Sequence, residues 1–279
     1  MPLNALTSAE ISLPARPDAS LVRERIAILA RHVDLVGLTD NHAGQPRMSP
    51  LAAVALAREQ GVATVVHVSC RDRNGLALRS QVVGAAALGC DGVLCLYGDT
   101  VPGVPRVKDY TTTRLLAEAR SWVEPYDLAL GCVVDPFALD SEAELALLGR
   151  KVTAGADFTQ TQMIFEHDRL ARFLDRATQE GRLGECHVYA SVPVIRTQRL
   201  ADTLNKVLPF GLPEPVYRQI AAGGGIDLAI GTAIAMADLP GIDALHVMAW
   251  GSAEAAGKVA AAFRAARGAP VERQPVPGG

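Results

Sequence analysis

Polar side chains close two apolar runs whose composition otherwise suits the interior of a protein. The first run ends in His67-Val68-Ser69-Cys70-Arg71-Asp72-Arg73-Asn74, and the next ends in Tyr97-Gly98-Asp99. Each run has the length and the β-branched content of a strand that is buried on both faces. The polar residues at their ends have no place in a core, so we predict that both ends open onto one site.

Three residues have side chains suited to acid–base chemistry, and each also has a purely structural interpretation. Glu10 lies in the apolar segment 9–14, where burial would raise the pKa of its carboxyl toward use as a general acid. An exposed glutamate near a loose chain end is the alternative. Asp99 precedes a segment rich in turn formers and either caps that turn or contacts a ligand. His67 is either a hydrogen-bonded core histidine or part of the site.

Arginines and glutamines in two of these segments leave similar alternatives. Arg71 and Arg73 either are solvated beside a residue that caps the next helix, or bind an anionic cofactor, since guanidinium groups pair well with phosphate. Gln160 and Gln162 are expected on the same face of one strand. One of them could fill the interior, and the other could hydrogen-bond a flat heterocycle because an amide both donates and accepts.

The composition favours a cytoplasmic protein that binds small molecules. The chain of 279 residues has a net charge of −3 and lacks a basic cluster, which argues against nucleic acid as a partner. Its five cysteines are scattered and form no CxxC pair, so we expect reduced core thiols and no metal site. The sequence contains neither a signal peptide pattern nor an apolar stretch of the ~18 residues that a membrane span needs.

Short apolar runs alternate with amphipathic helical segments along the chain. Eight strands are expected, at 10–13, 34–39, 62–68, 91–97, 128–134, 156–161, 187–195 and 244–250, with a longer helical insertion over 213–238. This count predicts an α/β fold of the (β/α)8 TIM-barrel type, with a doubly wound sheet as the competing arrangement. We expect a single barrel domain over 1–267 and a disordered tail over 268–279. A barrel would bring the polar strand ends to one rim.

Together these motifs resemble the methylenetetrahydrofolate reductase family over about residues 8–205. His67-Val68-Ser69-Cys70 is similar to the family's His-Leu-Thr-Cys, and Leu96-Tyr97-Gly98-Asp99 is similar to its Leu-Arg-Gly-Asp. The segment from Arg150 to Gln162 resembles its Arg-Lys-x-x-Ala-Gly-Ala-x-x-x-x-Thr-Gln, and Cys70-Arg71-Asp72-Arg73-Asn74 resembles a subgroup. The resemblance implies an oxidoreductase of one-carbon metabolism that reduces 5,10-methylenetetrahydrofolate to 5-methyltetrahydrofolate with NADH or NADPH, typically through bound FAD. It also implies a homo-oligomer.

The resemblance assigns roles to individual residues. Glu10 matches the proposed proton donor that opens the methylene bridge toward an iminium, and Asp99 matches an aspartate that would stabilise positive charge on the pterin. Gln162 matches the glutamine that hydrogen-bonds the pterin, and Leu204 lies near the position of a phenylalanine that packs between nicotinamide and flavin. The positions implied to contact the cofactor are Thr39, His67, Tyr97, Gly98, Asp99, Asp135, Glu144, Arg150 and Lys151.

Three departures from the family's pattern fall on positions implied to contact flavin. Tyr97 replaces the arginine before Gly-Asp, the segment 39–44 replaces a Thr-Tyr-Gly-Ala-Gly-Gly-like loop, and Asp135-Pro136-Phe137 replaces His-Pro-Glu. These changes would weaken the usual flavin contacts, which leaves direct hydride transfer from NAD(P)H to folate as an alternative to FAD. Two further alternatives are the same reaction in the oxidative direction and a non-catalytic folate-binding subunit.

Overall fold

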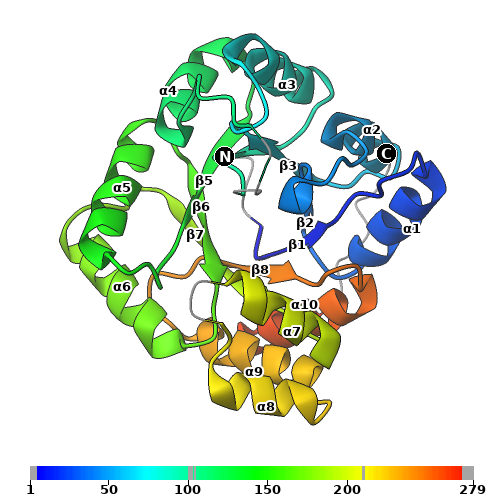
Figure 1. Cartoon of the computed structure of the whole chain (residues 1–279), viewed down its shortest axis with the longest axis vertical. Coiled ribbons are helices and arrows are strands. Elements are labelled where there is room, and N and C mark those ends of the chain that lie inside the picture. Colours follow the sequence, from blue (N-terminus) through cyan, green and yellow to red (C-terminus); the bar gives the residue numbers. More distant parts are fainter. Residues whose placement is uncertain (1–4, 100–102, 104, 209–210, 272–279) are drawn as a thin grey trace.

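Parallel strands close into a single barrel in sequence order, with the first strand paired to the last (Figure 1). The computed structural model describes residues 5–99, 103, 105–208 and 211–271. The pairing of the first strand with the last excludes a doubly wound sheet and confirms the predicted TIM barrel. Within the described residues the strands are β1 (Thr7–Ile11), β2 (Leu35–Leu38), β3 (Thr64–Ser69), β4 (Gly92–Leu96), β5 (Ala129–Val134), β6 (Phe158–Met163), β7 (His187–Pro193) and β8 (Ala244–Met248).

Helices surround this barrel and cover the outer faces of its strands (Figure 1). Among the described residues, none of these helices has the length and apolar character needed to cross a membrane. Residues 272–279 of the expected disordered tail lie outside the described residues. The helices are α1 (Ala19–Leu29), the 3-10 helix η1 (His42–Gly44), α2 (Pro50–Arg58), α3 (Gly75–Ala87), α4 (Thr112–Val123), α5 (Ser141–Thr153), α6 (His167–Gln179), α7 (Gln198–Val207), α8 (Glu214–Ala221), α9 (Gly225–Ala237) and α10 (Ala253–Ala266).

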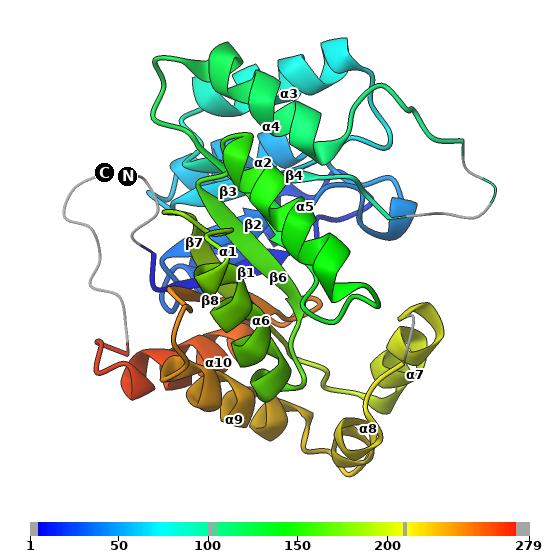
Figure 2. The same ribbon diagram turned by 90° about the vertical axis from the view of Figure 1, so that its left-hand side faces the viewer.

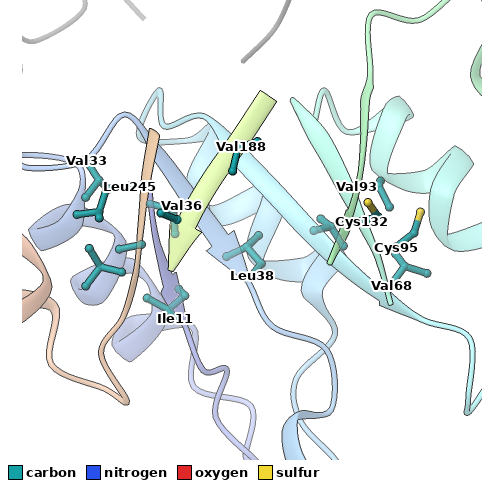
Figure 3. Close-up of a cluster of buried hydrophobic side chains, with 14 of the residues drawn as sticks. Ile11, Val33, Val36, Leu38, Val68, Val93, Cys95, Cys132, Val188 and Leu245 are labelled. Atoms are coloured by element: carbon teal, nitrogen blue, oxygen red, sulfur yellow. The ribbon is translucent and has the colours of Figure 1, made fainter. Parts of the chain in front are cut away.

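The main hydrophobic core lies between the strands and the surrounding helices (Figure 3). Val36 and Leu38 of β2 and Val68 of β3 belong to it, together with the thiols of Cys95 and Cys132. All five cysteines are buried and free, in agreement with the predicted core thiols. Because the inner faces of these strands are buried as well, their sequences are continuously apolar rather than alternating.

A second apolar cluster, which we call the barrel floor, fills the interior near the amino ends of the strands. The rings of Phe158 and Tyr189 meet edge to face there, with their centroids 5.7 Å apart. A Cβ at Gly131 would lie 2.1 Å from Phe158 Cζ, so glycine makes room for this ring. The floor closes the barrel below its polar residues. Its members are Leu35, Val65, Leu94, Ala129, Phe158, Tyr189 and Ala244.

Two expected elements differ from those observed. The first strand spans Thr7–Ile11 rather than 10–13, so Glu10 lies inside it and pairs in register with Gly37. The insertion expected over 213–238 is divided into α8 and α9 at Gly223, whose φ of 87° favours glycine, and α7 precedes both. A Cβ at Gly225 would lie 1.9 Å from the Ile195 carbonyl oxygen, which explains how α9 can begin against the end of β7. Figure 2 shows α7 and α8 set apart from the ring of outer helices.

Candidate functional site

Three ionisable side chains from separate strands meet inside the barrel, above its floor. Glu10 comes from β1, His67 from β3 and His246 from β8. A Cβ at Gly37 of β2 would lie 3.4 Å from both Glu10 Cβ and His67 Nε2. Glycine at this position therefore leaves the carboxyl and the imidazole close together, with no side chain between them.

His246 is held by two polar neighbours on one side and approaches Glu10 on the other. Its Nδ1 lies 2.9 Å from Ser8 Oγ and 3.3 Å from Gln160 Nε2. Its Nε2 lies 3.7 Å from Glu10 Oε2, which is beyond hydrogen-bond distance. Within the described residues, the buried Nε2 atoms of His246 and His67 have no hydrogen-bond partner. Such orphaned groups are rare in protein interiors, and both lie beside the same carboxyl, which identifies this place as a candidate site.

Burial and charge act in opposite directions on these groups. Burial raises the pKa of Glu10, but attraction to His246, with further contributions from His67 and His42, holds it below its ordinary value. The prediction of a raised pKa is therefore wrong for this structure, because the histidines outweigh burial. Burial also lowers the pKa of His67 to about 4, so that this imidazole is uncharged at neutral pH.

The predicted residues that follow β2 and β4 lie on the rim of the barrel. Thr39 is buried, and its hydroxyl donates a hydrogen bond to the Ile11 carbonyl oxygen over 3.1 Å. Tyr97 and Asp99 are exposed. The Asp99 carbonyl oxygen accepts a hydrogen bond from the Arg71 guanidinium, which fixes the backbone of this exposed residue. Gly98 joins them with a φ of 96°, a conformation that favours glycine.

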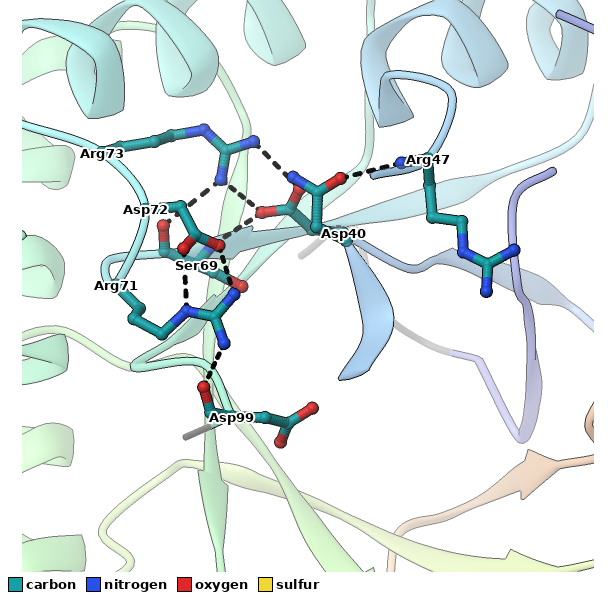
Figure 4. Close-up of polar contacts among 8 residues, drawn as sticks. Asp40, Arg47, Ser69, Arg71, Asp72, Arg73 and Asp99 are labelled. Atoms are coloured by element: carbon teal, nitrogen blue, oxygen red, sulfur yellow. Dashed lines mark hydrogen bonds and ion pairs between the residues drawn. The ribbon is translucent and has the colours of Figure 1, made fainter. Parts of the chain in front are cut away.

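Two arginine–carboxylate pairs brace this rim (Figure 4). Arg71 donates from Nε and Nη2 to the two oxygens of Asp72 over 2.8 and 2.6 Å. Arg73 makes the same two-pronged contact with Asp40, whose carboxylate also accepts a hydrogen bond from the Ser69 backbone over 2.9 Å. The side chain of Asp40 is only 1% exposed and that of Arg73 is 16% exposed. Each of these guanidinium groups therefore already binds a carboxylate through two nitrogens.

This pairing settles the sequence alternatives for the segment. Asn74 does cap α3, because its side chain accepts a hydrogen bond from the Ala77 backbone N–H. Arg71 and Arg73 are not solvated, as that interpretation assumed, and they do not present free forks for phosphate either.

Two of the predicted cofactor residues on α5 form hydrogen bonds to backbone groups at the end of β5. The Glu144 carboxyl accepts a hydrogen bond from the Asp135 backbone over 3.0 Å. Lys151 is 5% exposed and its Nζ donates to the Val133 carbonyl oxygen over 2.6 Å. Arg150 is exposed on the surface of α5. These contacts organise the strand end, and they use the charged groups that the resemblance assigns to a cofactor.

The two glutamines of β6 differ in burial. The register between β6 and β7 shifts between Gln160 and Met163, so Gln160 is buried and contacts His246 while Gln162 is exposed. The Gln162 side-chain oxygen accepts a hydrogen bond from the Met163 backbone over 3.0 Å. The expected alternation is interrupted at this register shift, where β6 has one more residue than β7 between the paired positions. Leu204 is 6% exposed and packs in an apolar cluster with Met163, away from solvent.

Ser8 and His246 were not among the predicted site residues. His246 lies within a strand of otherwise apolar residues, and a lone polar residue in such a strand is the signal that could have found it. Ser8 shares its strand with Thr7 and Glu10 and gives no such signal. Their contact depends on the closure of β1 against β8. Within the described residues, no group of three or more His, Cys, Asp or Glu side chains is arranged to hold a metal ion.

The charged side chains near the rim differ in whether they could meet the diphosphate of FAD. Of the charged groups near the rim, Arg71 and Arg73 are bound by carboxylates, and Lys151 is bound by a backbone carbonyl. Arg47 differs, because its buried Nε has no hydrogen-bond partner among the described residues and Figure 4 draws no contact to its guanidinium. A diphosphate could therefore meet this cation without displacing a buried contact, but no other feature of the described residues marks a flavin site, and we derive no step through a flavin.

Comparisons with known proteins agree with the fold and identify its family. A chain from Clostridium thermocellum, described as an uncharacterised protein that binds two copies of 5-methyl-5,6,7,8-tetrahydrofolic acid, matches with a TM-score of 0.69 at 12% identity, over 91% of this chain and 93% of that one. Tryptophan synthase from M. tuberculosis matches with a TM-score of 0.56 at 14% identity, over 93% of both chains. At these identities the likeness shows the fold alone.

Matches to curated sequences say more about the family than the structural matches do. The chain is 30% identical to 5,10-methylenetetrahydrofolate reductase of Escherichia coli K12 over 125 residues, which are 43% of this chain and 41% of the relative. It is 32% identical to a probable methylenetetrahydrofolate reductase (NADPH) of Caenorhabditis elegans over 120 residues, 41% of this chain and 18% of the relative. The match thus spans less than half of each relative's length. The profile of the family described as methylenetetrahydrofolate reductase matches residues 4–259, and the chain belongs to that family.

Proposed function

We propose that this protein transfers a hydride between a pyridine nucleotide and a folate, reducing 5,10-methylenetetrahydrofolate to 5-methyltetrahydrofolate with NADH or NADPH. The observation that carries the proposal is the Glu10 carboxyl inside the barrel, flanked by His67 and by His246. This is a carboxyl in reach of a ligand at the barrel mouth, where enzymes of this fold bind substrates. Membership of the reductase family supports the choice of folate.

In this reaction Glu10 gives a proton to the bridging amine nitrogen of the folate. The bond from that nitrogen to the methylene carbon breaks, and the carbon becomes an iminium on the other nitrogen. Hydride from NAD(P)H then adds to the iminium carbon, which gives the methyl group and NAD(P)+. The proton lost from Glu10 is replaced from solvent before the next turnover.

The charge state of the histidines decides whether Glu10 can act as an acid. His246 lowers the pKa of Glu10 through its N–H and its charge, whereas the contribution of His67 needs a charged imidazole, and His67, with a pKa of about 4, is uncharged at neutral pH. A folate in the barrel mouth would bury the carboxyl further, and burial raises its pKa. Substrate binding is therefore expected to favour the protonated acid.

Two rim residues complete the proposed site. Asp99 is exposed on a backbone fixed by Arg71, where its charge can stabilise the iminium. Gln162 has an exposed side chain whose amide can donate to and accept from the pterin. The departures from the family's flavin-contacting pattern at Tyr97 and at Asp135-Pro136-Phe137 favour hydride transfer directly from NAD(P)H over transfer through FAD.

The test compares Glu10→Gln with Glu24→Gln, which removes an exposed carboxylate from α1. Consumption of NADH or NADPH is followed with and without methylenetetrahydrofolate. We expect Glu10→Gln to lower the folate-dependent rate by about 10²–10⁴-fold, the usual contribution of a general acid, and Glu24→Gln to leave it unchanged. Parent-level turnover in Glu10→Gln would show that Glu10 is not the acid.

Spectroscopy of the purified protein decides the route of the hydride. A colourless protein that consumes NAD(P)H with folate supports direct transfer, and a flavin band that bleaches with NAD(P)H and returns with folate overturns it. Folate binding without nucleotide consumption in either direction would instead favour a non-catalytic subunit, and formation of NAD(P)H from methyltetrahydrofolate would establish the oxidative direction.

A further inference from the structure

Gln160 contacts His246 but is buried away from the exposed rim. It lies on β6, is 5% exposed and places its amide nitrogen 3.3 Å from His246 Nδ1. In the motif that resembles the family's Arg-Lys segment, Gln160 falls on a position that the motif leaves open, immediately before Thr161 and Gln162. The role of this side chain must therefore be found in its contacts in this chain.

The contacts of His246 bear on which ring nitrogen carries the proton. A neutral imidazole has one N–H donor and one acceptor nitrogen. Ser8 is compatible with either tautomer, because its hydroxyl can donate to Nδ1 over 2.9 Å, or accept from Nδ1 while donating to the Leu245 carbonyl oxygen over 3.3 Å. The Gln160 amide nitrogen is only a donor. A proton on Nδ1 would oppose it, so Gln160 distinguishes the two tautomers.

We propose that Gln160 is a positioning residue that holds His246 as the Nε2–H tautomer. The Nε2–H then faces the Glu10 carboxyl, and this direction is fixed because the amide opposes a proton on Nδ1. This inference deepens the proposed function and rests on it, because it assigns the group that orients the proposed acid.

The surroundings of the pair are consistent with this role. Glu10 on β1 is faced by His246 from β8, by His67 from β3 and by His42 from the 3-10 segment. The Nδ1 side of His246 is faced by Ser8, Gln160 and the Leu245 carbonyl oxygen, all of them neutral. A carboxylate on that side would stabilise imidazolium, whereas the amide does not.

The first experiment measures the tautomer directly in the protein without ligands. Histidine labelled with ¹⁵N in both ring positions is incorporated, and the His246 signals are assigned by their loss in His246→Gln. We expect Nδ1 at the shift of an unprotonated nitrogen and Nε2 at that of a protonated one near neutral pH. A proton on Nδ1 in the wild-type protein overturns the proposal, whether or not any variant folds.

The second experiment uses two substitutions of similar size. Gln160→Glu supplies an acceptor to Nδ1, so His246 should become imidazolium and the folate-dependent kcat at neutral pH should fall about ten-fold or more, one pKa unit being a ten-fold change in protonation. Gln160→Met removes the donor without adding an acceptor and should cost less. KM for folate should stay within two-fold, since Gln160 is only 5% exposed and contacts His246. Unchanged kcat and unchanged ¹⁵N shifts in Gln160→Glu would refute the role.

These outcomes separate the inference from the function on which it rests. A protein with the Nε2–H tautomer that never reduces folate would overturn the proposed function and leave the assignment of the His246 proton intact. A protein that reduces folate while His246 is protonated on Nδ1 would overturn the assignment of the His246 proton and leave the proposed function intact.

Discussion

The pair formed by Arg73 and Asp40 is expected to be strongly asymmetric in its effect on stability. The Asp40 side chain is 1% exposed, so Arg73→Met would leave a buried carboxylate that keeps its hydrogen bond from the Ser69 backbone N–H but loses its charged partner. Removing one partner of a buried ion pair costs about 3–5 kcal/mol. Asp40→Asn keeps that backbone contact and leaves Arg73, 16% exposed, able to reach water, so it should cost about 1.5–3 kcal/mol.

The double variant provides the sharper test of this reasoning. With Arg73 already replaced by Met, Asp40→Asn removes the stranded charge and should restore about 1–3 kcal/mol. The free energy of unfolding is measured in urea, by far-ultraviolet circular dichroism and by tryptophan fluorescence, and the two signals must coincide for a single value to apply. Further destabilisation by the second substitution would refute the idea that a buried, uncompensated carboxylate dominates the cost.

A matched control is available on the surface. Arg23 and Glu59 form a pair of similar length, 2.9 Å, with side chains 45% and 54% exposed. Arg23→Met should therefore cost less than about 1 kcal/mol. An equal cost for Arg23→Met and Arg73→Met would show that burial is not what separates them.

Two further predictions concern the barrel interior. Gly131→Ala should destabilise the protein by about 1–3 kcal/mol or more, because the new Cβ would meet the Phe158 ring at 2.1–2.5 Å. Gly231→Ala on α9 has open space around it and should be neutral or stabilising by up to about 1 kcal/mol. Urea unfolding of both variants measures the difference in free energy. His67 has a folded pKa of about 4 against an ordinary 6.5, so only the unfolded chain binds its proton between these values and stability should fall as the pH decreases from about 6.5 to about 4, by roughly 3 kcal/mol. His67→Gln should remove that part of the pH dependence, and an unchanged slope in this variant would contradict the assignment.

Local patterns in the sequence were sufficient to predict the barrel. Runs such as Val65-Val66 and Val93-Leu94 are apolar on both faces, which is a property of parallel strands between a filled interior and a layer of helices. Asn74 capping α3 could likewise be expected, since the hydrogen bond it makes spans only three residues. These features depend on neighbours in the chain, and their physical causes are present in short segments.

The position of the candidate acid was predicted, but its surroundings were not. Glu10 was identified from its apolar segment and its resemblance, and its pKa was expected to be raised by burial. The structure adds His246, which lies 236 positions later in the chain and reaches Glu10 because β8 pairs with β1. The net pKa shift is downward for that reason. Charge interactions depend on distance in space, and the sequence around Glu10 does not contain that distance.

The same distinction applies to the rim and to β6. The sequence alone determined the strand count, the apolar character of each strand and the presence of charged residues at the strand ends. Only the tertiary structure decided that Arg73 pairs with Asp40, that a register shift separates Gln160 from Gln162, and that Gln160 meets His246. Periodicity fixes which way a side chain points along an unbroken strand. Which partner it finds is decided by barrel closure and strand register, and these are set by the packing of the whole chain.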